Sequence, residues 1–100
     1  MICTLTARRI KPGQVDDFKA AFEGLTEETP EEVMKRWPNV YVCRDVTDEN
    51  VVLSFGFFDG TLDELREIQS EGGGPPEAVA QFVDEVLLDG SYEVVEEITN

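Results

Sequence analysis

Histidine is absent from the 100-residue chain, and only two of its residues are cysteines. The missing histidines exclude His-based catalytic triads, His general bases, zinc sites that use His and haem held by His. Cys3 and Cys43 are too few for a disulfide framework or a closed structural zinc site, and we expect both to be thiols in a reducing cytoplasm. We therefore expect no metal and no cofactor.

Positive charge is scarce as well. Eight Lys and Arg residues stand against 22 Asp and Glu residues, a net charge of −14, and residues 51–100 contain only Arg66 against twelve acids. Such a surface repels phosphate groups, so we expect neither nucleic acid nor an anionic membrane as a partner. The acidic surface favours solubility and would also suit a salty cytoplasm.

Long apolar runs are missing too. No segment approaches the length of a membrane span, and Arg8 and Arg9 interrupt the first apolar stretch too early for the core of a signal peptide. The hydrophobic content of 41% is nevertheless typical of a packed globular chain. We expect a single domain over residues 1–100 that buries about two-thirds of its surface.

Strands are predicted where β-branched and aromatic residues gather between turn signals, at residues 2–10, 40–46, 51–58 and 91–99. Helices are predicted between them from apolar residues at helical spacing. The first helical face consists of Val15, Phe18, Phe22 and Leu25. The last begins at Pro76, is closed by Asp89-Gly90, and carries Val79, Phe82, Val83 and Val86.

Two shorter helices carry capping signals. Thr29 and Glu32 predict a capping box, with Pro30 in the first helical position and a helix that places Val33 and Trp37 on one inner face. Thr61 and Glu64 predict a second capping box, followed by an apolar stripe of Leu62, Leu65 and Ile68.

The resulting order, β-α-β-β-α-β, is that of an α+β ferredoxin-like sandwich with a four-stranded antiparallel sheet. Segment 51–58 carries large apolar side chains on both faces, and helices can cover only one of them. We expect a second copy of the chain to cover the other face, which makes the protein a homodimer. The third strand lies between the first two in this fold, so about 9–10 Å separates Cys3 from Cys43, too far for a disulfide.

Three stretches carry a family resemblance: Ile10–Gly13 followed by Asp16–Phe18, Tyr41–Asp45 leading to Val51–Phe55, and Phe58-Asp59 before a helix. With the order of elements, they make the chain resemble the antibiotic biosynthesis monooxygenase-like domains of the dimeric α+β barrel superfamily. The resemblance implies a homodimer with a pocket in each subunit between sheet and helices. It also implies, for the active members, oxidation of polycyclic phenols by oxygen without a cofactor, and for one branch haem degradation.

The haem-degrading branch uses Asn, Trp and His, and this chain departs from it. There is no His, the first Asn is Asn39, and Phe57 or Phe58 stands where a Trp often ends the third strand. We therefore do not expect haem degradation.

Six aromatic residues are candidates for the lining of a pocket that binds a small hydrophobic or aromatic ligand, although each can equally be ordinary core. Trp37 and Tyr41 are favoured because each has a polar group that needs a partner. No catalytic residue is identified. The six candidates are Phe18, Phe22, Trp37, Tyr41, Phe57 and Tyr92.

Charged and glycine-rich segments leave further alternatives open. One of Arg8 and Arg9 should face inward, to form an ion pair or to hold the phenolate or carboxylate of a ligand; Arg44 is open to the same two interpretations. The acidic segment 45–50 is interpreted as a solvated turn, because it lacks the spacing of a calcium loop. Gly72–Gly74 is interpreted as a mobile loop that covers the pocket. The function is either cofactor-independent monooxygenation or non-catalytic ligand binding or assembly.

Overall fold

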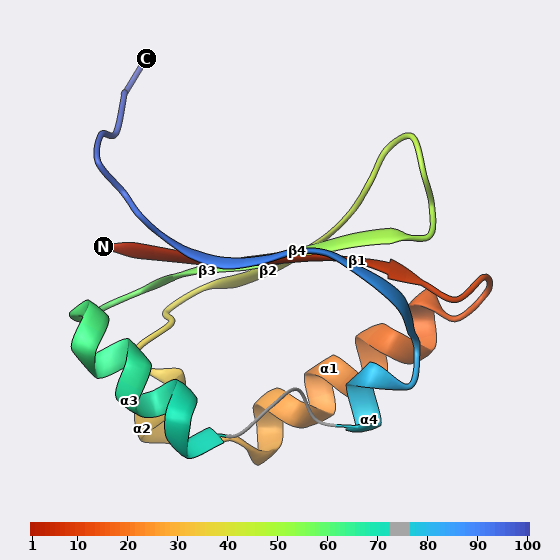
Figure 1. Cartoon of the computed structure of the whole chain (residues 1–100), viewed down its shortest axis with the longest axis horizontal. Coiled ribbons are helices and arrows are strands. Elements are labelled where there is room, and N and C mark those ends of the chain that lie inside the picture. Colours follow the sequence, from red (N-terminus) through yellow and green to blue (C-terminus); the bar gives the residue numbers. More distant parts are fainter. Residues whose placement is uncertain (73–76) are drawn as a thin grey trace.

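The computed structural model describes residues 1–72 and 77–100 and places four antiparallel strands in one sheet with all helices on one face (Figure 1). The strands are β1 (Ile2–Ile10), β2 (Val40–Arg44), β3 (Val51–Phe58) and β4 (Val83–Glu93), in the sheet order β2-β3-β1-β4. The helices are α1 (Val15–Glu28), α2 (Glu31–Met34), α3 (Leu62–Gly72) and α4 (Glu77–Ala80). The ferredoxin-like α+β fold is as the sequence predicts, with the third strand between the first two.

The register of β1 on β3 decides which side chains face the helices. Ile2 pairs with Phe58 and Arg8 with Val52, so the even-numbered residues of both strands share one face. Ile2, Val52 and Phe58 are buried there by the helices. The odd-numbered residues lie on the opposite face, which no helix covers (Figure 1). We call these the covered face and the free face.

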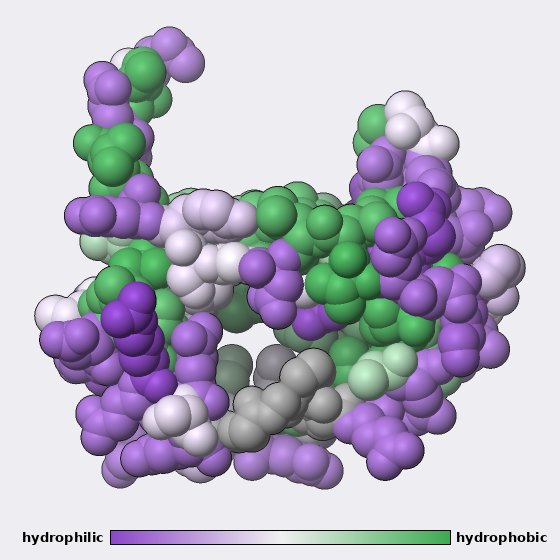
Figure 2. All heavy atoms as spheres, in the orientation of Figure 1, coloured by the Kyte–Doolittle hydropathy of each residue, from purple (hydrophilic) through white to green (hydrophobic). Residues whose placement is uncertain are grey.

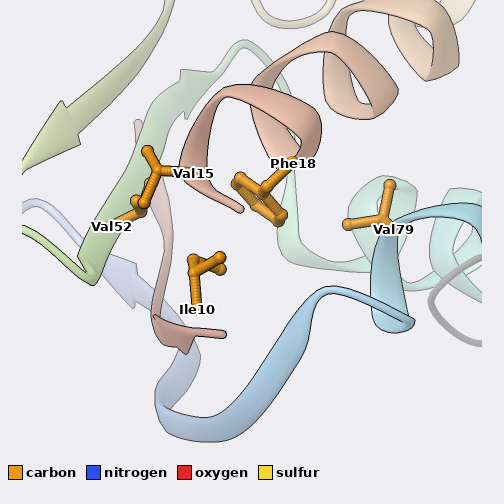
Figure 3. Packing of buried hydrophobic residues seen from close by; sticks show 5 residues of the cluster. All are labelled: Ile10, Val15, Phe18, Val52 and Val79. Carbon is orange, nitrogen blue, oxygen red and sulfur yellow. The ribbon is translucent and has the colours of Figure 1, made fainter. Parts of the chain in front are cut away.

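Two apolar clusters hold the helices against the two ends of the covered face. Figure 3 shows the first, in which Phe18 of α1 is directed toward Ile10 at the end of β1. The second joins Ile2 and Phe58 to Leu65 of α3. The first cluster contains Ile10, Val15, Phe18, Val52 and Val79. The clusters lie at opposite ends of β1, so the middle of the covered face is left between them.

The C-terminal third differs from the sequence prediction. The helical face of Val79, Phe82, Val83 and Val86 does not form, because α4 ends at Ala80 and β4 begins at Val83. One register shift, between Arg9 and Ile10, explains the misleading spacing: Val83 pairs with Ile10, and Val86 pairs with Arg8. The one extra residue of this bulge puts Val83 and Val86 on the same face of a strand although they are three residues apart.

The end of the chain also differs. The strand predicted over residues 91–99 is wrong in its bounds, since β4 ends at Glu93 and residues 94–100 have no regular structure. This segment and the β2–β3 connection both project on the free side of the sheet (Figure 1). Val95 and Ile98 in the segment are largely exposed.

Only one of the two predicted capping boxes forms. At the start of α3, the Glu64 amide donates to Thr61 Oγ1 over 3.2 Å, and the Thr61 amide donates to Glu64 Oε1 over 3.1 Å. At α2 the prediction is wrong, because the Thr29 hydroxyl donates back to the Leu25 carbonyl at the end of α1. Pro30 therefore stands in the cap position of α2, which ends before Trp37.

Three further predictions concern membrane-spanning segments, the two thiols and the glycine-rich segment. No helix of the described residues has the length and hydropathy needed to cross a membrane. Cys3 and Cys43 are free, as predicted, with Cys43 exposed. Gly73, Gly74 and Pro76, on which the predicted covering loop and the predicted helix start depend, lie outside the described residues.

Candidate functional site

A cavity of about 330 Å³ lies between the middle of the covered face and helices α1 and α2. Figure 2 shows this side of the molecule hollowed beneath the sheet. Most of the wall is apolar, and its apolar part comes from α1, α2, the residues that follow α2, and β3. These residues are Phe22, Leu25, Val33, Met34, Trp37, Val40, Phe55 and Gly56.

The floor of the cavity is polar because of the two-residue period of β1. Thr4, Thr6 and Arg8 alternate onto the covered face, and Ser54 of β3 lies directly opposite Thr6. The indole Nε1 of Trp37 donates to Thr4 Oγ1 over 3.0 Å, which ties the wall to the floor. The hydroxyl of Thr6 donates to Asp89 Oδ1 over 3.3 Å.

Trp37 can lie against the sheet because β3 has a glycine at the contact. A Cβ built on Gly56 would stand 2.9 Å from the backbone oxygen of Asn39 and 3.2 Å from Trp37 Cδ1. Any larger residue would push the segment around Trp37 away from the strand and change the shape of the cavity.

Arg8 is the only cationic residue of the cavity wall in the described part of the chain. Its Nη1 donates to Ser54 Oγ over 3.2 Å, and its Cζ lies 5.6 Å from the centre of the Phe18 ring. Burial lowers the pKa of Arg8, and the carboxylate of Asp89 opposes that shift. A guanidinium keeps its proton under such conditions, so the cavity contains a positive charge.

The neighbouring Arg9 has the opposite environment. It points to the free face, where its Nη1 is 2.9 Å from Asp48 Oδ2 and its Nε is 3.8 Å from Glu85 Oε2. Of the two adjacent arginines, one is therefore in surface ion pairs and the other is in the cavity, as the sequence requires for a strand.

Three of the six predicted site residues come together at the cavity. Phe22 and Trp37 line it, and the fully buried Phe18 supports it from behind, with its ring centre 6.1 Å from that of Phe22. The other three lie on the free face, where their side chains are 38–49% exposed: Tyr41, Phe57 and Tyr92.

A second cavity, of about 570 Å³, lies at the end of the sheet and includes Tyr41 and Phe57 in its wall. It also involves Met1, Asp59 and Gly60. This cavity has no buried polar side chain in its wall and adjoins the free face, so it offers little to fix the orientation of a ligand.

The residues that sequence reasoning did not place in the site are mainly its polar floor. The relevant signal was the run of Thr4, Thr6 and Arg8 at alternate positions in a strand whose other residues, except Arg9, are apolar. Such alternation marks one face as polar, but only the helices decide that this face is covered rather than open to water.

Catalytic groups of the usual kinds are missing from the wall of the first cavity. Among the residues that the structure describes, its lining contains no Asp, Glu, Cys or Tyr. Nor do residues 1–72 and 77–100 contain a group of three or more Cys, Asp and Glu side chains that could hold a metal ion. A reaction in this cavity would have to use a substrate that ionises in water.

The acidic segment after β2 forms a solvated turn, as interpreted from the sequence. Asp45 Oδ1 accepts hydrogen bonds from the hydroxyl and the amide of Thr47, both over 2.7 Å, and these bonds lower the pKa of Asp45. Asp48 accepts from the Asn50 amide and pairs with Arg9. The carboxylates of Asp45 and Asp48 therefore accept hydrogen bonds from within the turn and stabilise it.

Comparison with known proteins supports the fold. No protein-family model matches the sequence, and no curated protein matches it. Among solved structures, a candidate antibiotic biosynthesis monooxygenase from Chloroflexus aurantiacus J-10-fl is similar over 98% of this chain and 96% of its own, with a TM-score of 0.64 and 13% identity.

Two further structures have the same fold. A dimeric ferredoxin-like protein from an uncultured marine organism covers 99% of this chain and 91% of its own, with a TM-score of 0.67 and 13% identity. A NIPSNAP domain protein from Burkholderia xenovorans covers 100% of both chains, with a TM-score of 0.68 and 10% identity. The chain thus has the ferredoxin-like fold that these proteins share, over essentially its whole length.

Proposed function

We propose that this protein is a cofactor-independent monooxygenase-like protein that binds a small aromatic or polycyclic substrate between its sheet and its helices. The observation that carries the proposal is the cavity of about 330 Å³ with apolar walls and a few converging polar groups on its floor. This combination is typical of small-molecule sites, in which apolar surface supplies affinity and polar groups fix orientation. The two free thiols fit a reducing cytoplasm as its location.

The chemistry that suits this wall is oxidation of a phenol to a quinone by molecular oxygen. The ring C–H and the phenol O–H are lost, one oxygen atom becomes the second carbonyl, and the other leaves as water with the two hydrogens. The phenol supplies four electrons and oxygen accepts them, so the step balances without a cofactor. A phenol can lose its O–H proton to water and enter as the phenolate, which suits a cavity whose lining offers no general base.

The proposed assembly is a homodimer through the free face. Tyr41, Phe57, Leu88 and Tyr92 are each 38–49% exposed there in a single chain. Exposed apolar surface costs about 25 cal/mol per Å², and a second copy related by two-fold symmetry would cover it. A protein of similar structure is a dimeric ferredoxin-like protein, which supports a dimeric assembly.

The alternative is non-catalytic binding in the same cavity or a role in assembly only. It is favoured by the absence of carboxylate, thiol and phenol groups from the described lining. Monooxygenation and non-catalytic binding both need a ligand in the cavity, but only the first consumes oxygen; a role in assembly only needs neither.

Oxygen uptake with a panel of hydroxylated naphthalenes and anthracenes tests the proposal, with quinone formation followed by absorbance. We expect uptake by the wild type and its loss in Leu25→Trp, because Leu25 is in the cavity wall. Leu62→Trp is the matched control, since Leu62 is 46% exposed on α3 and outside that wall. Binding without uptake would select non-catalytic binding, and no binding of any compound would contradict both ligand-based functions and leave a role in assembly only.

A further inference from the structure

We propose that Arg8 and Ser54 form an anion subsite, so that the ligand of the cavity is an aromatic compound with one ionised oxygen, a carboxylate or a phenolate. The inference rests on the proposed function in assuming that the cavity takes a ligand, and it adds which chemical class that ligand belongs to.

Arg8 combines partial burial with the lack of an acidic partner. Arg9, Arg36 and Lys35 each have a carboxylate oxygen within 4 Å, but within residues 1–72 and 77–100 no carboxylate lies that close to Arg8. The other basic side chains without such a partner there are solvent-exposed, whereas Arg8 is half-buried. The chain has 22 acidic residues for eight basic ones, so an unpaired arginine is not explained by a shortage of acids. A half-buried guanidinium without a counter-ion is unfavourable until a ligand supplies one.

Asp89 is the acidic residue closest to filling that role, and it does not. It lies on β4 opposite Thr6, and its Oδ1 accepts the Thr6 hydroxyl over 3.3 Å. It is also solvent-exposed and has no oxygen within 4 Å of an Arg8 nitrogen, so it acts on Arg8 through its charge and not as a direct partner. The side of Arg8 that faces the cavity is therefore open to a ligand.

The guanidinium of Arg8 is held by one aromatic ring and one hydrogen bond. The Phe18 ring lies 5.6 Å from its Cζ, and Ser54 Oγ accepts its Nη1 over 3.2 Å. This single bond leaves most of the five guanidinium donors for a ligand. Ser54 is only 7% exposed, and because its oxygen accepts from Arg8, its own O–H can donate to the same ligand oxygen. Guanidinium and hydroxyl thus converge on one acceptor.

The charges of the cavity and of the whole chain limit the charge that a ligand can carry. Arg8 is the one cation of the described cavity wall, whereas the whole chain carries −14. A ligand with a single negative charge can pair with Arg8, but a polyanion such as a nucleotide would be repelled by the remaining acids. The apolar remainder of the wall, with Phe22 and Trp37, suits an aromatic body.

Calorimetric titration with matched probes tests the inference. The probes are 2-naphthoate with 2-naphthamide, and 4-nitrophenolate with 4-nitroanisole, so that each anion has an uncharged compound of similar shape. The proteins are wild type, Arg8→Met, Ser54→Ala and Arg9→Met. Arg9→Met removes the same charge from the adjacent residue on the other face of the sheet.

We expect the wild type to prefer an anion to its neutral counterpart. Arg8→Met should weaken binding of the anion by about ten- to a hundredfold, because a hydrogen bond to a charged group is lost. The affinity for the neutral probe should change by no more than about twofold. Ser54→Ala should have a smaller effect in the same direction, and Arg9→Met none. The probe pair for which Arg8→Met abolishes the preference for the anion identifies the ligand as a carboxylate or as a phenolate.

Two results would overturn the inference while the proposed function stands. One is that the wild type binds the anion and the neutral probe with equal affinity. The other is that Arg8→Met and Arg9→Met weaken binding of the anion equally. Failure of all four probes to bind the wild type would instead overturn both. Retained binding of the neutral probe shows that Arg8→Met is folded, so a loss confined to the anion cannot come from unfolding.

Discussion

The middle of the covered face presents Thr4, Thr6, Arg8 and Ser54 under the helices, whereas the free face presents large apolar side chains to solvent. An isolated globular chain would have the reverse distribution, because buried polar groups and exposed apolar groups both cost free energy. The proposed ligand and the proposed dimer would each explain one half of this reversed distribution. The covered face has room and polar groups for a ligand, and the free face has the apolar surface for a partner.

The adjacent residues Phe57 and Phe58 allow the two faces to be compared directly. Phe58 is fully buried on the covered face, with the Trp37 ring centre 4.8 Å and the Arg36 guanidinium carbon 4.9 Å from its own ring. We expect Phe58→Ala to lower the free energy of unfolding by about 3–5 kcal/mol, because it leaves a cavity beneath the helices. Urea denaturation measures the loss. A decrease below about 1 kcal/mol would show that this end of the covered face is not a packed core.

Phe57→Ala should act on association. Phe57 is 38% exposed on the free face, so its truncation should cost the fold little but weaken the dimer by about 2 kcal/mol, close to thirtyfold in Kd. Sedimentation equilibrium at low micromolar concentration measures this, with Leu62→Ala as the control on the helical side. Added salt should tighten the wild-type dimer by screening the charge of −14 per chain. A wild type that sediments at 11.2 kDa in low and moderate salt would exclude the dimer.

The smallest effect is expected at the surface of the helical layer. The Arg36 guanidinium donates to Glu64 Oε2 over 2.6 Å, and with the Thr61 bonds this lowers the pKa of Glu64 from 4.5 to about 2. A carboxylate with a lowered pKa stabilises the fold above its ordinary pKa, and the contribution is lost as the pH falls from about 4.5 toward 2. We expect Glu64→Gln to flatten the decline of Tm over this range, measured by circular dichroism. Identical pH profiles for the two proteins would show that solvent screens the pair completely.

Sequence reasoning located β1, α1, β2 and β3 because their signals are local. Val15 and Phe18 recur at helical spacing, and Val51–Phe58 alternates with apolar residues on both faces. The same reasoning failed at β4, because its bulge opposite Arg9 and Ile10 gives Val83 and Val86 the spacing of a helix. A bulge is set by pairing with a distant strand, so no local pattern reveals it.

The same limit applies to the candidate site. Because side chains alternate along a strand, the sequence predicts that Arg8 and Arg9 point to opposite faces, and that Tyr41 and Phe57 each point to one of the two faces of the sheet. Nothing in the sequence says which of those faces the helices cover.

The amino-acid sequence was enough to predict the α+β order of elements, the apolar character of β3 on both faces, the excess of acid and the absence of histidine chemistry. The folded chain was needed to learn that Arg8 is in the cavity and that Tyr92 is on the free face. The physical reason is that strand alternation is a local steric property of the backbone, whereas the choice of covered face depends on packing between residues such as Phe18 and Ile10, or Phe58 and Leu65.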